Sequence, residues 1–291
     1  MIFEGSAVAL VTPFDKNNEV NYFELKKLID FQIANGTKAI VILGTTGESS
    51  TITRKERTQI IKFCVCLIAK KIPLIVGTGT NSTKTTIELS KEAELLGADG
   101  LLIVTPYYNK CNQEGLFEHY KSVAKSVKIP IILYNVPSRT GVNILPETVI
   151  KLSKIKNIVA IKEASGNLSQ IQKIITNVSR EFFVYSGDDE LTLPLIAMGA
   201  KGVISVTANS NPSDVCYLCE YALFGDYFNA CRFAKHLYEL NKALFLDVNP
   251  ICIKYYMNLS EFEVGKPRLP LTEPNLKIKN QLKEIKAKYE N

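Results

Sequence analysis

A lysine stands at the end of an apolar stretch, where a long cationic side chain is unexpected. Lys162 follows the run IVAI at 158–161. A cation in such a run is costly unless the protein needs it there. Burial disfavours the charged form of an amine and lowers its pKa, and a neutral amine is a nucleophile. Such an amine forms an imine with a ketone or aldehyde, which stabilises a carbanion on the adjacent carbon. The sequence therefore predicts aldolase-type chemistry at Lys162.

Imine chemistry also needs groups that move protons and hold a charged substrate. Because imine formation expels water, an acid/base such as a tyrosine must stand beside the lysine. Threonine and tyrosine hydroxyls can relay the proton to solvent, and an arginine can clamp a carboxylate with paired hydrogen bonds. Such residues follow the expected strands at Thr45, Thr46, Tyr107, Tyr108, Tyr134 and Arg139.

Short apolar runs, separated by amphipathic stretches, must position these side chains. Runs rich in Val, Ile and Leu without alternation are typical of strands buried on both faces, as in a parallel sheet. They lie at 7–12, 39–43, 73–77, 100–104, 130–135, 158–162, 182–187 and 202–206. A helical pattern follows each run, so the sequence predicts an α/β fold, a (β/α)8 TIM barrel with its chemistry at the carboxyl ends of the strands. A doubly wound sheet is the alternative from the pattern alone.

Two capping signals mark where helices should begin. Asn21 with Glu24, and Thr53 with Glu56, have the spacing of capping boxes. Each therefore predicts the first turn of an amphipathic helix.

The barrel is expected to close near residue 224. Residues 1–224 would form the catalytic barrel and residues 225–291 a C-terminal helical region. Near the end, Ile278, Leu282 and Ile285 share one face of an amphipathic helix. Its lysines are interpreted as a solvated face, so neither nucleic-acid nor membrane binding is predicted.

Composition and cysteine usage narrow the class of protein. The chain is 46% hydrophobic and 22% charged, with a net charge of +6, as in ordinary globular domains. No stretch approaches a membrane span, and Glu4 stands where a signal peptide needs basic residues. Cys216 and Cys219 form a C-x-x-C without a second pair or a nearby histidine, so no zinc site is predicted. The seven cysteines favour a reducing compartment, and a cytoplasmic protein without metal or other cofactor is expected.

Two acidic residues after the seventh strand have a structural interpretation. Asp188 and Asp189 precede a helical pattern, and carboxylates favour the N-terminal ends of helices. They are expected to cap that helix, because no histidine or further carboxylate is placed nearby to complete a metal site.

Five motifs, in order, resemble those of the class I pyruvate-dependent aldolases. GTTGESST, VTPYYNK, YNVPSRTG, IKEASGN and GDD followed by GVISVT are similar to the motifs of the dihydrodipicolinate synthase family. The similarity spans nearly the whole chain, from GSAVALVTPF to NPICIKYY. The resemblance implies condensation of pyruvate with L-aspartate-4-semialdehyde, toward diaminopimelate and lysine. It also implies a homotetramer built as a dimer of dimers.

The resemblance implies a role for each matching position. Lys162 would form the imine with pyruvate, with Tyr134 as the general acid/base beside it. Thr45 and Tyr108 would complete a hydroxyl relay, Tyr108 across a subunit interface. The remaining substrate contacts would be Thr46 and nearby amides for the pyruvate carboxylate, Arg139 for the carboxylate of the second substrate, and backbone groups of Gly187 and Ile204 bordering the lysine.

The sequence leaves two other functions open. N-acetylneuraminate lyases share the lysine and tyrosine but, as a family, lack the PSRTG motif that carries Arg139, so a sister pyruvate aldolase or lyase is the alternative. A non-catalytic barrel used as a binding protein is a hypothesis of another class. It would be expected to lose Lys162 or Tyr134, and both are present.

Many members of the resembled family bind lysine as a feedback inhibitor at the dimer interface. Thr85 stands where sensitive enzymes carry a glutamate, and Arg54 and Arg57 stand where they often carry histidines. Added cations and a missing carboxylate should repel a cationic ligand, so weak or absent lysine inhibition is predicted. The positions that match the inhibitor site are Ser49, Ser50, Arg54, Arg57, Asn81, Thr85 and Tyr107.

Overall fold

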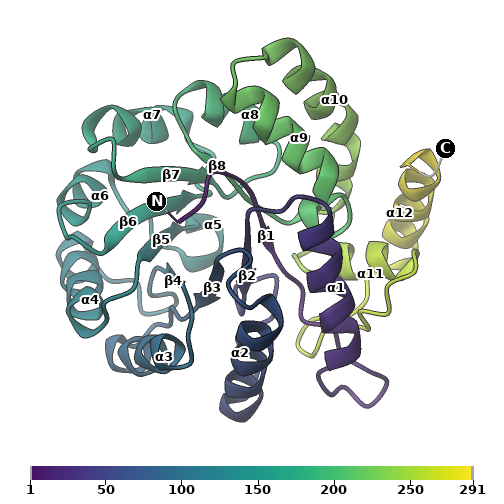
Figure 1. Ribbon diagram of the computed structural model, residues 1–291, viewed down its shortest axis with the longest axis horizontal. Helices are drawn as coiled ribbons and strands as arrows, with labels where there is room; N and C mark the ends of the chain where they lie inside the picture. The colour runs from purple at the N-terminus through teal and green to yellow at the C-terminus, as the bar shows by residue number, and fades with distance from the viewer. Residues whose placement is uncertain (1, 290–291) are drawn as a thin grey trace.

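The computed structural model, which describes residues 2–289, is built on a closed barrel of parallel strands. Strand order in space follows strand order in the chain, and β8 pairs with β1 to close the barrel (Figure 1). This confirms the predicted (β/α)8 fold and excludes the doubly wound sheet. The strands are β1 Gly5–Ala9, β2 Ala39–Ile42, β3 Leu74–Gly77, β4 Gly100–Val104, β5 Ile131–Asn135, β6 Ile158–Glu163, β7 Phe183–Ser186 and β8 Gly202–Ser205.

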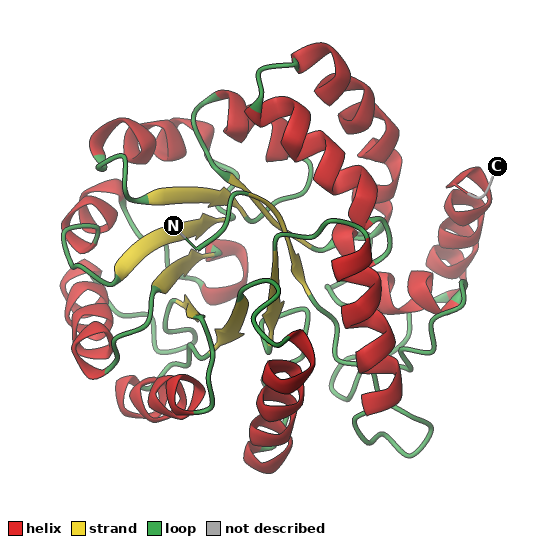
Figure 2. Cartoon of the chain, in the orientation of Figure 1, coloured by secondary structure: helices red, strands yellow, loops and turns green. Residues whose placement is uncertain are grey.

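Helices surround the strands on the outside of the barrel (Figure 2). Those that alternate with the strands are α1 Tyr22–Ala34, α2 Arg54–Ile68, α3 Thr83–Leu95, α4 Gln113–Ser126, α6 Pro146–Leu152, α7 Leu168–Asn177, α8 Thr192–Ala197 and, after the short 3₁₀ turn Thr207–Asn209, α9 Pro212–Leu223. The single turn α5 Pro137–Thr140 precedes α6 and lies inside the ring of helices, where Ser138 and Arg139 line a cavity (Figure 1). Later in the chain come α10 Tyr227–Ala243, α11 Ile251–Asn258 and α12 Leu276–Tyr289.

The first strand is shifted from its predicted place at 7–12. It begins at Gly5, where Gly5–Val8 pair with β8, and it ends at Ala9. Beyond that point Leu10 N still donates to Val41 O, and bonds that involve side chains follow: Val11 N donates to Asn209 Oδ1, and Thr12 Oγ1 donates to Gly47 O. The apolar run continues past the strand because it packs under the loops of the barrel mouth.

Two apolar layers hold the barrel. Inside it, alternate strand residues such as Val41, Leu102 and Ile132 meet around the axis. Outside it, the opposite faces of the strands pack against the helices, where Leu28, Ile61 and many others are fully buried. Strands covered on both sides explain the unbroken apolar runs of the sequence.

One predicted capping box forms and the other does not. Thr53 and Glu56 form both bonds of a capping box at the start of α2. Asn21 caps α1 by accepting from the Glu24 backbone N–H, as expected. The Glu24 carboxylate, however, accepts from the backbone N–H of Glu263, so the expectation that it closes the box was wrong. A distant segment of chain competes for that carboxylate, which local spacing cannot reveal.

Asp188 and Asp189 do not cap the helix after β7, which corrects the prediction. Leu191 is the residue before α8, and no side chain caps that helix. Asp189 instead accepts hydrogen bonds from Ser205 Oγ and from the backbone N–H groups of Val206 and Thr207. Its buried carboxylate therefore ties the end of β7 to the end of β8.

The last three helices lie on the outside of the barrel. α10 packs on α9, and α12 contacts both α10 and α11 (Figure 1). Leu282 of α12 is fully buried, and Ile278 and Ile285 pack beside it, as the amphipathic pattern predicts. No helix within residues 2–289 is both long and apolar enough to cross a membrane.

Candidate active site

Strand pairing brings the two central residues of the predicted site together. Tyr134 and Lys162 are direct register partners on β5 and β6. Side chains at paired positions of parallel strands point to the same side, and both of these point into the barrel mouth. The Lys162 Nζ lies 4.5 Å from the centroid of the Tyr134 ring. Lys162 is 5% exposed, so its amine is largely removed from solvent.

Gly187 leaves the space that the lysine occupies. A Cβ atom at this position would lie 2.9 Å from Lys162 Cε, 3.1 Å from Lys162 Cγ and 2.8 Å from Ala164 Cβ. Real Cβ atoms do not approach other carbons so closely, so any side chain here would displace Lys162. The predicted position of Gly187 beside the lysine therefore has a steric basis.

A cavity of about 330 Å³ opens in front of Lys162. It contains four of the predicted side chains, those of Lys162, Tyr134, Thr46 and Arg139, together with Gly187. A volume of this size suits small ligands of the kind that aldolase chemistry uses. The other lining residues are Val136, Ser138, Ala164, Asp188, Glu190, Val206, Phe245 and Asn249.

Asn249 links two of the predicted binding residues. Its Nδ2 donates to Thr46 Oγ1 at 3.0 Å, and its carbonyl oxygen accepts from Arg139 Nη2 at 3.2 Å. Its own Oδ1 is buried without a hydrogen-bond partner. Asn249 thus fixes the positions of Thr46 and Arg139 relative to each other, and it comes from the segment just before α11.

Thr45 and Tyr107 line a neighbouring cavity of about 300 Å³, rather than the cavity of Lys162. The two cavities share Val136, Arg139 and Asn249 as a common wall. The clustering predicted at one rim is therefore divided into two adjoining chambers.

Two predicted residues lie outside both chambers. Tyr108 is 89% exposed and has a left-handed backbone conformation with φ 74°, so its ring stands away from the barrel. Ile204 is fully buried in the apolar cluster inside the barrel that includes Tyr134. Val206, just beyond the end of β8, lines the lysine cavity instead.

The seven positions matched to the inhibitor site do not share one chamber in the described chain. Ser49, Ser50 and Tyr107 line the Thr45 chamber. Arg54 pairs with Glu92. The remaining positions are held in different ways: Arg57 is 6% exposed and donates to Gly77 O, the carbonyl of Asn81 accepts from Asn109 Nδ2, and Thr85 Oγ1 donates to Ser82 Oγ in the first turn of α3.

A buried polar network supports the strand ends from behind. Next to the Tyr134–Lys162 pair, Asn135 and Glu163 are also register partners, and they point to the helix side. Glu163 accepts from Asn135 Nδ2, from the Ser165 backbone N–H and from Gln170 Nε2. Burial raises the pKa of Glu163, and these hydrogen bonds oppose the shift. The network contains no cation, so hydrogen bonds alone satisfy this carboxylate.

Charge at the cavity mouth is mixed. The amine of Lys162 and the guanidinium of Arg139 line the same cavity as the carboxyl groups of Asp188 and Glu190. Burial raises the pKa of Asp188, although it accepts a hydrogen bond from the backbone of Glu190. The site can therefore attract an anionic substrate and also offers a carboxyl group near the mouth.

Reasoning from the sequence gave no role to several of these residues. The cavity is also lined by Asn249, Phe245 and Glu190, which the sequence analysis did not predict as site residues. The Asn-Pro dipeptide at 249–250 signals a turn, which is the only local clue to Asn249. Within residues 2–289 no cluster of His, Cys, Asp and Glu could hold a metal ion.

Comparisons with known proteins agree on one family. The model of the dihydrodipicolinate synthetase family matches residues 2–288. A 4-hydroxy-tetrahydrodipicolinate synthase of Clostridium acetobutylicum is 50% identical over 97% of this chain and 96% of its own. The crystal structure of dihydrodipicolinate synthase from Aquifex aeolicus superposes with a TM-score of 0.95, at 47% identity over 99% of this chain and 98% of that one. The crystal structure of an enzyme of the same name from Cyanidioschyzon merolae, solved with lysine bound, superposes with a TM-score of 0.95. It is 40% identical over 98% of this chain and 97% of that one.

Proposed function

Because this chain belongs to the dihydrodipicolinate synthetase family, we propose that its Lys162 cavity condenses pyruvate with L-aspartate-4-semialdehyde. The activity is that of a 4-hydroxy-tetrahydrodipicolinate synthase, a lyase, and it rests on relatives that match over the full length. The observation that supports the site assignment is the buried Lys162 beside the Tyr134 ring. The roles of individual residues follow from that geometry and from the motifs.

Lys162 supplies the nucleophile. Its Nζ attacks the keto carbon of pyruvate, and the keto oxygen leaves as water after taking up protons. The protonated imine withdraws electrons, so a proton leaves the pyruvate methyl group and an enamine forms. The enamine carbon then adds to the aldehyde of the second substrate and forms the new carbon–carbon bond. The amine of that substrate closes the ring on the imine carbon and releases Lys162.

Tyr134 would move these protons. It lies beside the lysine on the neighbouring strand, and the 4.5 Å between Lys162 Nζ and the centroid of its ring supports this role. We assign it the role of general acid/base. Thr45, in the adjoining chamber, would pass protons onward.

Two residues are assigned to the substrate carboxylates. Thr46 lines the lysine cavity and is buried, so its hydroxyl and the nearby amides would hold the carboxylate of pyruvate. Arg139 is exposed at the entrance, where its guanidinium can bind the carboxylate of the incoming second substrate. Asn249 keeps both in place.

Assembly into a homotetramer is part of the proposal. Tyr108 is a large aromatic side chain that projects into solvent on a left-handed backbone. Contact with a second copy of the chain would bury it and could bring its hydroxyl to the relay of the neighbouring site. We also assign the protein to the cytoplasm, in line with its free cysteines.

Trapping the imine tests the proposal directly. The protein is incubated with pyruvate and reduced with borohydride, and the adduct is located by peptide mass spectrometry. We expect one reduced pyruvate on the peptide that contains Lys162, and none in the folded Lys162→Ala variant. Absence of the adduct on the folded wild-type protein would refute the assignment of Lys162.

A sister pyruvate lyase, such as an N-acetylneuraminate lyase, is the alternative that trapping alone does not exclude. A screen of aldehyde partners separates the two. L-aspartate-4-semialdehyde should consume the pyruvate imine at least tenfold faster than N-acetylmannosamine does.

A further inference from the structure

The C-terminal part of the chain contacts the loop after β2 at two residues, Thr46 and Glu48. Asn249, just before α11, donates to Thr46 Oγ1 at 3.0 Å. Lys254, one turn into α11, donates from its Nζ to Glu48 Oε1 at 2.9 Å. Thr46 and Glu48 both belong to the GTTGE segment that also carries Thr45. One contact from α11 and one from the residue pair before it thus hold the loop that we assign to pyruvate binding.

Lys254 is completely buried, and each of its protons has an acceptor. Besides Glu48 it donates to Thr12 O at 3.0 Å and to Lys266 O at 3.1 Å. Its ammonium also lies 4.1 Å from the centroid of the Phe14 ring. Burial lowers the pKa of Lys254 to about 8, while Glu48 opposes that shift and Arg268 adds to it. The lysine therefore remains mostly charged at neutral pH and can pair with Glu48.

Glu48 is as firmly held as Lys254. Its backbone adopts a left-handed conformation with φ 55°, which few residues other than glycine adopt without support. Its second carboxylate oxygen accepts from the Arg268 backbone N–H at 2.8 Å. Thr12 Oγ1 holds the preceding carbonyl, that of Gly47, at 2.7 Å. The shape of the loop therefore depends on partners outside the loop.

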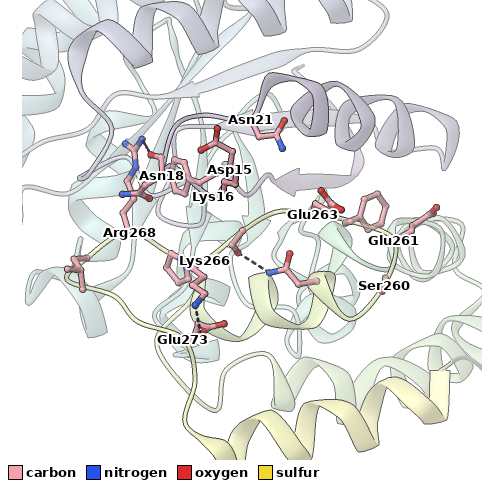
Figure 3. Close-up of a pocket in the computed structure, with 16 residues that line it drawn as sticks. Asp15, Lys16, Asn18, Asn21, Ser260, Glu261, Glu263, Lys266, Arg268 and Glu273 are labelled. Atoms are coloured by element: carbon pink, nitrogen blue, oxygen red, sulfur yellow. Dashed lines mark hydrogen bonds and ion pairs between the residues drawn. The ribbon is translucent and has the colours of Figure 1, made fainter.

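The segment between α11 and α12 completes this arrangement. Arg268 donates to the carbonyls of Thr51 and Asn18, and its guanidinium pairs with Glu56 at the start of α2. Figure 3 shows Arg268 reaching Asn18 at the edge of a groove of about 1070 Å³, with Lys266 and Glu273 paired beside it. This connection keeps Arg268 N and Lys266 O in place around the buried pair.

We propose that Lys254 is a positioning residue of the active site, which acts through Glu48 to hold Thr46 and Thr45 at the barrel mouth. A buried ion pair contributes little to stability compared with apolar residues of the same size, but it fixes geometry at both ends. The C-terminal helical region is therefore part of the pyruvate-binding apparatus. This inference rests on the proposed function of the Lys162 cavity.

The test measures pyruvate binding separately from folding. The double variant Lys254→Met/Glu48→Gln removes both charges at nearly constant volume, so neither partner is left as an unpaired buried charge. The control variant Lys288→Met breaks a C-terminal ion pair with Glu239 on the surface, away from the loop. For each protein, borohydride trapping at Lys162 is titrated with pyruvate, and the trapped fraction is normalised to the folded fraction from circular dichroism.

We expect the pyruvate concentration for half-maximal trapping to rise about tenfold in the double variant, with the maximal trapped fraction close to that of the wild type. That pattern indicates lost substrate binding without loss of the nucleophile. The pyruvate concentration for half-maximal trapping in the control variant should remain within twofold of the wild-type value. A purely structural role would lower the melting temperature and leave half-saturation of the folded protein unchanged, which would overturn the inference.

A milder variant covers the case in which the double variant does not fold. Glu48→Asp keeps the negative charge, so Lys254 is not left as an unpaired buried charge, but it withdraws the carboxylate by one methylene from Lys254 Nζ and from the Arg268 N–H. The pyruvate concentration for half-maximal trapping should rise at least threefold. A concentration within twofold of the wild-type value would refute the role of this pair. Failure of the wild-type protein to trap pyruvate at all would instead refute the proposed function, so the two failures are distinguishable.

Discussion

Tyr134 and Lys162 are register partners on neighbouring parallel strands, and the Lys162 Nζ lies 4.5 Å from the centroid of the Tyr134 ring. If Tyr134 moves the protons of imine chemistry, the Tyr134→Phe variant keeps the ring contact but loses the acid/base. We expect kcat to fall by about 10²–10⁴-fold, the usual contribution of a positioned acid/base. Steady-state kinetics with both substrates checks this.

Tyr185 provides a matched control for Tyr134. It is the register partner of Lys162 on the other side, on β7, but its hydroxyl donates to Phe3 O at 2.7 Å. Tyr185→Phe should lower the free energy of unfolding by about 1 kcal/mol, the value of a typical hydrogen bond, and leave kcat within threefold. Equal losses of kcat in both variants would contradict the assignment of Tyr134.

Gly187 is predicted to be essential for steric reasons. In Gly187→Ala the new methyl group would lie 2.9 Å from Lys162 Cε, so the lysine must leave its position under the cavity. We expect the rate of pyruvate adduct formation at Lys162 to fall by about 10²-fold, as for a misplaced reacting group. The new methyl group would also lie 2.8 Å from Ala164 Cβ. Adding Ala164→Gly relieves only that contact, so adduct formation in the double variant should stay slow. Recovery of the rate in the double variant would assign the defect to Ala164 instead.

The barrel and its central pair can be predicted from local sequence. Apolar runs of strand length mark the eight strands, and Lys162 is conspicuous because it interrupts one of them. Tyr134 follows from its place in the preceding strand, and the motifs place Arg139 after it. These features depend on residues that are near in sequence or on the regular geometry of a parallel barrel.

The supports of the site are hidden because they are distant in the chain. Asn249 contacts Thr46 across 203 residues, and Lys254 contacts Glu48 across 206. Both lie in or beside a helical pattern that gives no indication of which barrel loop it touches. The same reason explains why Glu24 does not complete the predicted capping box and Asp189 does not cap a helix: distant backbone amides bind their carboxylates in the folded chain.

Glu163 is predicted to support catalysis through Asn135. A carboxylate only accepts, and the groups that contact the Glu163 carboxylate, from Asn135, Ser165 and Gln170, are all donors. Glu163→Gln sets an amide against these donors and disturbs Asn135, which also accepts from the Ile144 N–H beyond the Arg139 turn. We expect a loss of about 1–3 kcal/mol in unfolding free energy and a raised KM for the aldehyde. Denaturant titration and kinetics test both. An unchanged KM would confine Glu163 to folding.

The pair of Arg268 and Glu56 should make stability depend on pH. The hydrogen bond from Arg268 lowers the pKa of Glu56 to about 2 from an ordinary 4.5. A depressed pKa means that the stabilisation is complete above about pH 4.5 and is lost as the pH falls toward 2. Arg268→Gln should therefore cost about 1–3 kcal/mol at pH 7, and the difference from wild type should shrink below pH 4.

Denaturant titrations between pH 2.5 and 7 check this dependence. Arg54 serves as the control, because its contact with Glu92 is longer, at 3.5 Å, and its side chain is mostly exposed. Arg54→Gln should change the free energy of unfolding by less than about 1 kcal/mol, as for surface ion pairs. A loss in Arg268→Gln that is the same at pH 2.5 and pH 7 would show that Glu56 is not the partner responsible.

We predict weak or absent inhibition by lysine, although the structure weakens part of the charge argument for it. Arg57 is buried against Gly77 O, and Arg54 is paired with Glu92, so these two cations would repel a ligand less than their charges suggest. The missing carboxylate at the exposed Thr85 becomes the main reason. An inhibition constant for lysine in the sub-millimolar range would contradict the prediction.

Restoring a carboxylate should restore part of the affinity for lysine. Thr85→Glu adds one ion pair worth about 1 kcal/mol, which corresponds to an inhibition constant lowered about fivefold. Thr85→Gln has the same length without the charge and should behave like the wild type. Raising the salt concentration should weaken the gain, because it screens exposed charges. If Thr85→Glu and Thr85→Gln respond alike to lysine, the charge at this position does not control inhibition, and side-chain length would explain any change.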